Sequence, residues 1–139
     1  MVERKFQPLQ APFYLSSYLS YKADLCYITA RLDEAAALND EALQLAQAVT
    51  RKDIVFSCRL LQAKLAATAD PGNATQSFDA LMGEYTDASD QAAILYETYL
   101  INHGQAQREK SLALYRALYR ESPTAEIKGK IDDLERDET

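Results

Sequence analysis

The residue types that most often carry enzymatic chemistry are scarce in this chain. It contains one histidine, His103, and two cysteines, Cys26 and Cys58, far apart in the sequence. A structural zinc site needs about four His or Cys ligands at short spacings, so we expect no metal ligand. Both cysteines fall within helical patterns and form no CxxC motif, which favours buried packing. His103 precedes Gly104 at an expected helix end, where capping is favoured over proton transfer.

Carboxylates and glycines add no catalytic pattern. Acidic residues occur as sequence neighbours in Asp33-Glu34, Asp40-Glu41 and Asp132-Asp133. Adjacent residues do not face each other on a helix, so these pairs indicate solvation and capping instead of paired acid and base groups. The four glycines are scattered and form no phosphate-binding loop. The sequence therefore predicts no catalytic residue, no cofactor and no enzymatic activity.

Length and composition indicate one helical domain. The chain has 139 residues, of which 22 are Ala and 18 are Leu, with only nine Val plus Ile, four Gly and four Pro. A chain so poor in strand and turn formers is not a sandwich, a barrel or a doubly wound sheet, and helices must pack on helices. We expect an N-terminal extension or linker at 1–11 and a single helical repeat domain at 12–137.

Charge and hydropathy restrict the partners. The net charge of −6 has the wrong sign for binding phosphates, so nucleic acid is not expected as a partner. The N-terminus lacks the apolar run of a signal peptide, and no stretch approaches the roughly 20 apolar residues of a spanning helix. These features predict a soluble, cytoplasmic protein with no membrane partner.

Helix-stopping residues divide the chain into seven segments of helical length, with no candidate strand. Asp33 and Asp53 are expected N-caps, Gly104 is expected to end a helix in the left-handed conformation, and Ser122 is expected to cap a closing helix with Pro123 in its first turn. The stops fall at Pro8 and Pro12, 31–33, 50–53, 70–73, 86–87, 103–104 and 122–123. The first two helices are expected at 12–30 and 33–50, and the later ones begin at Asp53, at Pro71 or Asn73, at Asp87 or Asp90, at about Gln107 and at Ser122.

The first of these helices is apolar on two sides. One face carries Tyr14, Tyr18, Tyr21, Leu25 and Ile28, and a second carries Leu15, Leu19, Ala23 and Cys26. Such a helix is expected to be wedged between neighbours. Tyrosine combines apolar area with a hydroxyl and suits a surface that is dry when bound and wet when free. The tyrosines could equally fill gaps between helices.

Every second helix shows a common pattern. Aligning Ala35, Ala74 and Ser111 places Asn39, Phe78 and Tyr115 four residues later and Ala42, Leu81 and Leu118 seven residues later, with steps of 39 and 37 residues. A small residue followed by larger ones at i+4 and i+7 lets a helix pack closely on a partner. A near-constant step in this range indicates a solenoid of helical hairpins.

The run from Ala30 to Leu43, with Ala23 before it, resembles the turn and second helix of a tetratricopeptide repeat. Ser111, Tyr115, Leu118 and Pro123 resemble the same unit in the third hairpin. Asn39 stands where a bulky aromatic is usual, and armadillo-like or other helical-pair solenoids fit the same pattern. The resemblance implies a right-handed α-α superhelix of three helical hairpins with a C-terminal capping helix.

The resemblance also implies a concave face formed by the first helix of each hairpin, which usually holds a peptide or a partner helix. Ser20, Asp24 and Tyr27 would face this groove from the first hairpin, and Arg59 and Lys64 from the second. Ser20 and Asp24 do not match the Lys and Asn pair that clamps a chaperone's C-terminal carboxylate, so no chaperone partner is predicted. Together with Tyr14, Tyr18 and Tyr21, these residues form the expected partner-binding set.

The sequence thus predicts a non-enzymatic scaffold or adaptor that binds a protein or peptide partner. One alternative is a regulatory, repeat-containing part of a larger bacterial signalling or transcription protein. Another is a homo-oligomeric structural protein in which the apolar first helix meets its copy across a two-fold axis, giving a homodimer. No Lys or Arg occurs from Leu65 to Gln107, whereas 108–130 is locally basic, and this polarity could orient a charged partner.

Overall fold

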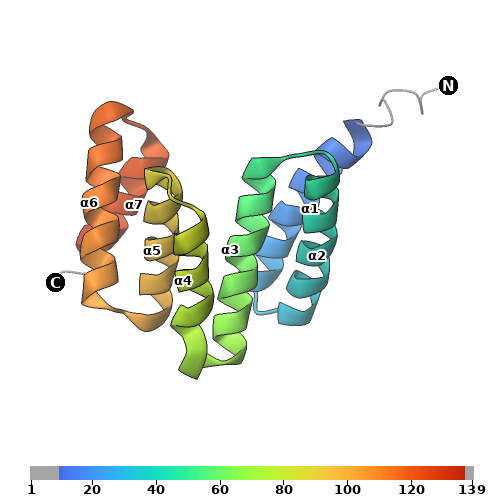
Figure 1. Ribbon diagram of the computed structural model, residues 1–139, viewed down its shortest axis with the longest axis horizontal. Coiled ribbons are helices and arrows are strands. Elements are labelled where there is room, and N and C mark those ends of the chain that lie inside the picture. The colour runs from blue at the N-terminus through green and yellow to red at the C-terminus, as the bar shows by residue number, and fades with distance from the viewer. Residues whose placement is uncertain (1–9, 137–139) are drawn as a thin grey trace. The chain divides into compact units, whose positions relative to one another are not determined.

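The computed structural model describes residues 10–136, and within that range the secondary structure is all helical, as expected, with short turns between the helices (Figure 1). Seven α-helices and one short 3₁₀ turn account for the elements of these residues, and no strand occurs among them. The elements are α1 (Gln10–Ile28), α2 (Leu32–Ala48), α3 (Lys52–Ala69), η2 (Pro71–Asn73), α4 (Ala74–Glu84), α5 (Ala88–Asn102), α6 (Gln105–Glu121) and α7 (Ala125–Arg136). Most of the expected extension at 1–11 lies outside the described residues, and its last two residues belong to α1.

The helices group into two compact units, with the boundary after Ala69. The first unit holds α1, α2 and α3, and the second holds η2 and α4 to α7. The boundary therefore falls between α3 and α4, the two helices that the sequence pattern assigns to the second hairpin.

Small residues allow close helix packing in the first unit. Ala23, Ala35 and Ala42 are completely buried, and α1 packs along α2 while α2 packs along α3. Leu19, Ala42 and Cys58 form a buried cluster that joins all three helices. Ala42 and Ala35 are therefore contact positions, as the repeat pattern predicts; the side chain of Ala74, the third aligned alanine position, lies outside the described residues.

The second unit has an aromatic core centred on α5, which packs against α4 and α6. Tyr96 of α5 and Tyr115 of α6 meet edge to face with ring centroids 6.4 Å apart, a favourable arrangement of their ring quadrupoles. Burial raises the pKa of the Tyr115 hydroxyl, which therefore stays protonated. The buried members of this core are Ala92, Tyr96, Tyr99, Leu112, Tyr115, Ile131 and Leu134.

The turn between α5 and α6 differs from the expectation for Gly104. His103 adopts the left-handed conformation, with φ of 56°, and its N–H donates to the Tyr99 carbonyl at 2.7 Å. His103 is thus the C-cap, as expected, whereas the prediction of a left-handed Gly104 is wrong: its φ is −72° and it precedes α6. A Cβ at Gly104 would meet the ends of the Gln107 and Asn102 side chains, which would have to shift.

Three expected N-caps also shift by one or two residues. Ser122 is the C-cap of α6, and α7 is capped by Thr124, whose Oγ1 accepts a hydrogen bond from the Ile127 N–H at 3.2 Å. The helices α2 and α3 begin at Leu32 and Lys52, so Asp33 and Asp53 lie inside the first turn. Negative charges in a first turn still interact favourably with the helix dipole, which explains why the sequence signal resembles a cap.

Candidate interaction surface

One face of α1 is buried against its neighbours. Ser16, Leu19, Ala23 and Cys26 are buried, at spacings that place them on one side of the helix. The Ser16 hydroxyl satisfies its polar group by donating to the Phe13 carbonyl at 2.7 Å. This face joins α1 to α2 and α3, and it leaves the opposite side of α1 without cover from these helices.

The opposite side of α1 is apolar and exposed. Tyr18 is 56% exposed, Tyr21 is 64% exposed and Ile28 is 75% exposed, and Tyr14 and Leu25 belong to the same row. We call this row the α1 stripe: Tyr14, Tyr18, Tyr21, Leu25 and Ile28. Of the eight large hydrophobic side chains that are exposed within residues 10–136, seven lie on α1, the exception being Leu100 of α5.

The sequence pattern groups these five residues on one face, but the predicted partner-binding set includes only three of the five, namely the tyrosines. The structure places Tyr14, Tyr18 and Tyr21 at the surface and not in gaps between helices. Leu25 and Ile28 extend the same exposed row by two further steps. Their regular spacing was the signal that could have added them to the site.

The face expected to line a groove lies between α1 and α3. Tyr27 of α1 and Lys64 of α3 meet there, with Lys64 Nζ 4.7 Å from the centre of the Tyr27 ring, a cation–π contact. Ser20 is buried beside Cys58, whose Sγ lies 3.9 Å from the Ser20 hydroxyl. The structure thus brings Ser20, Tyr27 and Lys64 into the α1–α3 contact, and this side of α1 is not the one that carries the stripe.

Asp24 and Arg59, the remaining residues of the expected groove, are half-buried on α1 and α3. Burial raises the pKa of the Cys58 thiol, the hydrogen bond to Ser20 lowers it, and the negative charge of Asp24 raises it again. The net direction is upward, so Cys58 is held as a neutral thiol. A protonated, buried thiol is a packing group and not a nucleophile.

Asn39 of α2, the departure from the repeat pattern, has a definite structural role. Its side chain is completely buried, and Nδ2 donates to the Cys58 carbonyl of α3 at 2.8 Å. In the second unit, Ser111 of α6 similarly donates to the Ala92 carbonyl of α5 at 3.0 Å. Buried polar side chains at these positions therefore link neighbouring helices through a backbone carbonyl.

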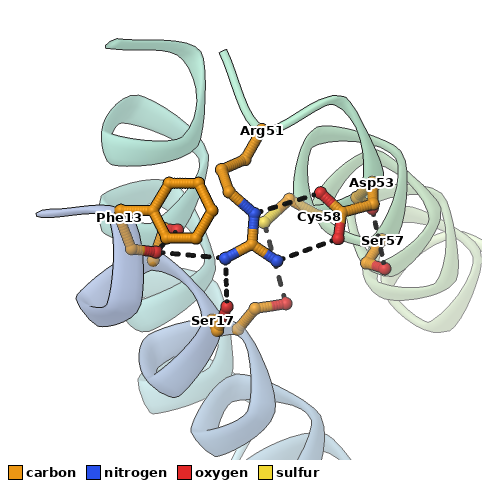
Figure 2. Close-up of polar contacts among 8 residues, drawn as sticks. Phe13, Ser17, Arg51, Asp53, Ser57 and Cys58 are labelled. Atoms are coloured by element: carbon orange, nitrogen blue, oxygen red, sulfur yellow. Dashed lines mark hydrogen bonds and ion pairs between the residues drawn. The ribbon is translucent and has the colours of Figure 1, made fainter. Parts of the chain in front are cut away.

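Arg51 fixes the beginning of α1 against the turn before α3 (Figure 2). Thr50 adopts a left-handed conformation and the Arg51 N–H returns to the Ala46 carbonyl at 2.8 Å, which ends α2 and orients the arginine. Arg51 Nη1 then donates to the Phe13 carbonyl at 3.2 Å and to Ser17 Oγ at 2.7 Å. The sequence predicts a helix stop at 50–53 with Asp53 as the next N-cap, and it misses the contact of Arg51 with α1 because a partner 34 residues away leaves no local pattern.

The guanidinium of Arg51 also binds a carboxylate and an aromatic ring. Nε and Nη2 donate to the two Asp53 oxygens at 3.2 and 2.9 Å, and the guanidinium carbon lies 4.3 Å from the centre of the Phe13 ring. The hydrogen bond from Arg51 is the main cause that lowers the Asp53 pKa, and the same bond raises the pKa of Arg51. This ion pair therefore persists at neutral pH and holds the first turn of α1, where the α1 stripe begins.

The second unit offers a polar groove between α6 and α7. Its cavity of about 350 Å³ is lined by Arg116, Tyr119, Arg120, Lys128, Ile131, Asp132 and Glu135. Arg116 pairs with Glu135 at 2.6 Å, and Lys128 pairs with Asp132 at 2.9 Å. The locally basic segment of the sequence is thus partly neutralised within the fold, which weakens its attraction for an acidic partner.

Among residues 10–136, no group of three or more His, Cys, Asp and Glu side chains is placed to hold a metal ion. No helix in the same part of the chain is both long enough and apolar enough to cross a membrane. Comparisons with protein-family models, with curated proteins and with solved structures found no match to this chain.

Proposed function

We propose that this chain is a non-enzymatic protein-interaction module that binds an apolar segment of a partner protein on the α1 stripe. The observation that carries the proposal is the concentration of exposed large hydrophobic side chains on one helix. The largest contiguous apolar patch on a monomeric protein is often functional, and patches larger than a few hundred square ångströms mark interaction sites. The patch also contains three tyrosines, a residue type that is enriched among the side chains contributing most to binding energy at interfaces.

The architecture that we propose is a right-handed stack of helical hairpins similar to tetratricopeptide repeats. The completely buried Ala23, Ala35 and Ala42 support this arrangement, since close approach at such positions is what stacked hairpins require. In this arrangement the Tyr27–Lys64 contact lies where first helices of successive hairpins meet. The α1–α3 face, with Ser20, Asp24 and Arg59, would then form a polar side of the module and the α1 stripe its apolar side.

The mechanism in this proposal is display on rigid helices. Helices held by a packed core present side chains with little loss of conformational entropy on binding. Arg51 contributes by fixing the first turn of α1, so that Tyr14 and Tyr18 stand in one row before a partner arrives. A partner helix would bury its own apolar residues between the tyrosine rings.

A photo-crosslinking experiment tests this function. A benzophenone amino acid placed at Tyr21, in cells that naturally produce the chain, is expected to give a discrete protein adduct. The same amino acid at Leu100, which is also exposed at 44% but lies on α5, is the matched control and is expected to give none. The Tyr21 adduct should disappear when Ile28→Glu introduces a charge elsewhere in the α1 stripe.

Two results would contradict the proposal. One is the absence of any adduct at Tyr18, Tyr21 and Ile28. The other is an adduct that forms equally at Leu100 and is unaffected by Ile28→Glu, because that pattern indicates random collision and not binding at the α1 stripe.

A further inference from the structure

The α1 stripe has the spacing of a coiled-coil seam. Its residues follow one another at intervals of four, three, four and three. At 3.6 residues per turn, all five fall within an arc of about 80° on the helix surface. A strict alternation of three and four, confined to a narrow arc, is the pattern by which one helix packs lengthwise on another. The stripe is therefore shaped for a second helix along its whole length.

A comparison with α5 shows that the exposed side of α1 lacks a packed neighbouring helix. Tyr96 and Tyr99 give α5 an aromatic, apolar character like that of α1, yet α5 is packed by α4 and α6, and both tyrosines are buried. By contrast, α1 is packed by α2 and α3 on one side, and Tyr18 and Tyr21 on the other side are exposed. Within residues 10–136, no other helix presents an exposed row of large hydrophobic residues that could cover the stripe.

We propose that a second copy of this chain covers the α1 stripe, so that two α1 helices pack on each other across a two-fold axis in a homodimer. This proposal rests on the proposed function of the stripe as a protein-binding surface and names its partner. A second α1 carries the same heptad spacing by definition, and a two-fold interface needs a self-complementary patch of this kind.

The exposed area is sufficient for a specific dimer. The fractional exposures of the five stripe residues correspond to roughly 600 Å² in each copy, with about 200 Å² assigned to each large apolar side chain. Two copies would bury roughly 1,200 Å² in total, the lower limit of standard specific interfaces. Leu15 and Phe13, which are 40% and 39% exposed beside the stripe, would add to this area. An interface at this lower limit is expected to be weak, so association is tested in the micromolar range.

The charge distribution permits the pairing. The whole chain has a net charge of −6, but α1 contains only Lys22 and Asp24 and is neutral. Lys22 lies at the edge of the stripe, with Nζ 5.7 Å from the centre of the Tyr18 ring. Two α1 helices can therefore meet without repulsion between net charges.

Light scattering and sedimentation equilibrium of the purified chain test the dimer. At micromolar concentrations the expected mass is twice 15.6 kDa. Tyr21→Glu is expected to weaken dimerisation at least about thirtyfold, because it buries a charge at the centre of the interface. Ile28→Glu should do the same from the end of the stripe, and Leu100→Glu, the matched control on α5, should leave the dimer intact.

Single-cysteine crosslinking locates the contact independently of dimer affinity. Cys26 and Cys58 are 2% and 0% exposed, so they give little background. Among Tyr18→Cys, Tyr21→Cys and Leu25→Cys, at least one is expected to form a disulfide-linked dimer under mild oxidation, whereas Leu100→Cys is not. Circular dichroism of each variant should match the native helical spectrum, since all these side chains are exposed.

A wild-type chain that remains monomeric throughout the micromolar range would overturn the dimer. So would a dimer that persists in both Tyr21→Glu and Ile28→Glu, or one that crosslinks only at Leu100→Cys. A monomer whose Tyr21 still crosslinks to a different protein in cells would refute self-association alone and leave the interaction function intact. Loss of both signals would refute both proposals.

Discussion

Arg51 Nη1 donates a hydrogen bond of 2.7 Å to Ser17 Oγ, which connects the turn before α3 to the beginning of α1 (Figure 2). The same nitrogen reaches the Phe13 carbonyl at 3.2 Å. The Phe13 carbonyl lies in the first turn of α1, where backbone carbonyls accept hydrogen bonds from N–H groups further along the helix. The hydrogen bond from Arg51 is additional, and it connects α1 to the rest of the first unit through a side chain outside the α1–α2 core. Arg51 thus adds a polar contact at the beginning of α1, where the tyrosine row starts, to the packing of α1 on α2 and α3.

We expect Arg51→Ala to lower the free energy of unfolding by about 2 kcal/mol, because several hydrogen bonds and the stacking on Phe13 are lost together. Arg51→Lys should recover less than half of the loss, since one ammonium group cannot reproduce the planar fork. Urea unfolding followed by circular dichroism measures both. Arg31→Ala is the control: its ion pair with Glu34 is exposed and 3.7 Å long, and the expected change is within about 0.5 kcal/mol.

Asp53 predicts a pH dependence of stability. Arg51 lowers the pKa of Asp53 in the folded state, so the pair stabilises the fold above the unfolded pKa of about 3.9 and this contribution is lost as the pH falls through the lower folded value. Because Asp53 is largely exposed, Asp53→Asn should cost only about 0.5 kcal/mol at pH 7. In urea titrations at several pH values, the difference between the two proteins should shrink as the pH falls below about 3.9 and vanish only below the lowered folded pKa.

A double variant separates this pair from other effects. In an Arg51→Ala background, Asp53→Asn should change the stability at pH 7 less than in the native chain, since the partner charge is absent and only the interaction with the first turn of α3 remains. An undiminished effect in that background would show that Asp53 acts on the α3 first turn and not through Arg51.

Cys58 should be chemically inert in the folded chain. Its side chain is completely buried and burial raises its pKa, so little thiolate is present and reagent access requires opening of the helices. We expect Cys58 and Cys26 to react with an aromatic disulfide reagent at least about a hundredfold more slowly than in the unfolded chain. Tyr21→Cys, on the exposed face, is the reactive control; rapid labelling of Cys58 in the native protein would contradict the burial.

Gly129 is a position where stability can be gained. It lies in the interior of α7, and a Cβ built there has no atom within 4 Å. Gly129→Ala should raise the free energy of unfolding by about 0.5–1 kcal/mol, because alanine loses less backbone entropy in a helix. Gly104→Ala is the contrasting variant: its Cβ would press on Gln107 and Asn102, and no gain is expected in the same thermal or urea melts.

Helix content and helix order could be predicted because they depend on local patterns. Periodic apolar residues and sparse Gly and Pro define seven segments, and seven α-helices occur within residues 10–136. The capping residues were less predictable. Ser122 and Thr124 both suit an N-cap, and the choice between two such neighbours depends on small energy differences.

The candidate site was likewise predictable in part. The sequence alone placed Tyr14, Tyr18 and Tyr21 in one row, since helical spacing requires it. It could not decide which face of α1 would remain exposed, because that depends on which helices pack against it.

Only the tertiary structure shows that α1 leaves its tyrosine row exposed while the similarly apolar α5 is packed by α4 and α6. Likewise, only the fold brings Arg51 to Ser17 and Lys64 to Tyr27, since these pairs are far apart in the chain. Local periodicity determined the helices and the composition of their faces. Long-range packing, which buries one face of α1 and leaves the opposite one exposed, decided which side of the helix is available for the proposed interaction.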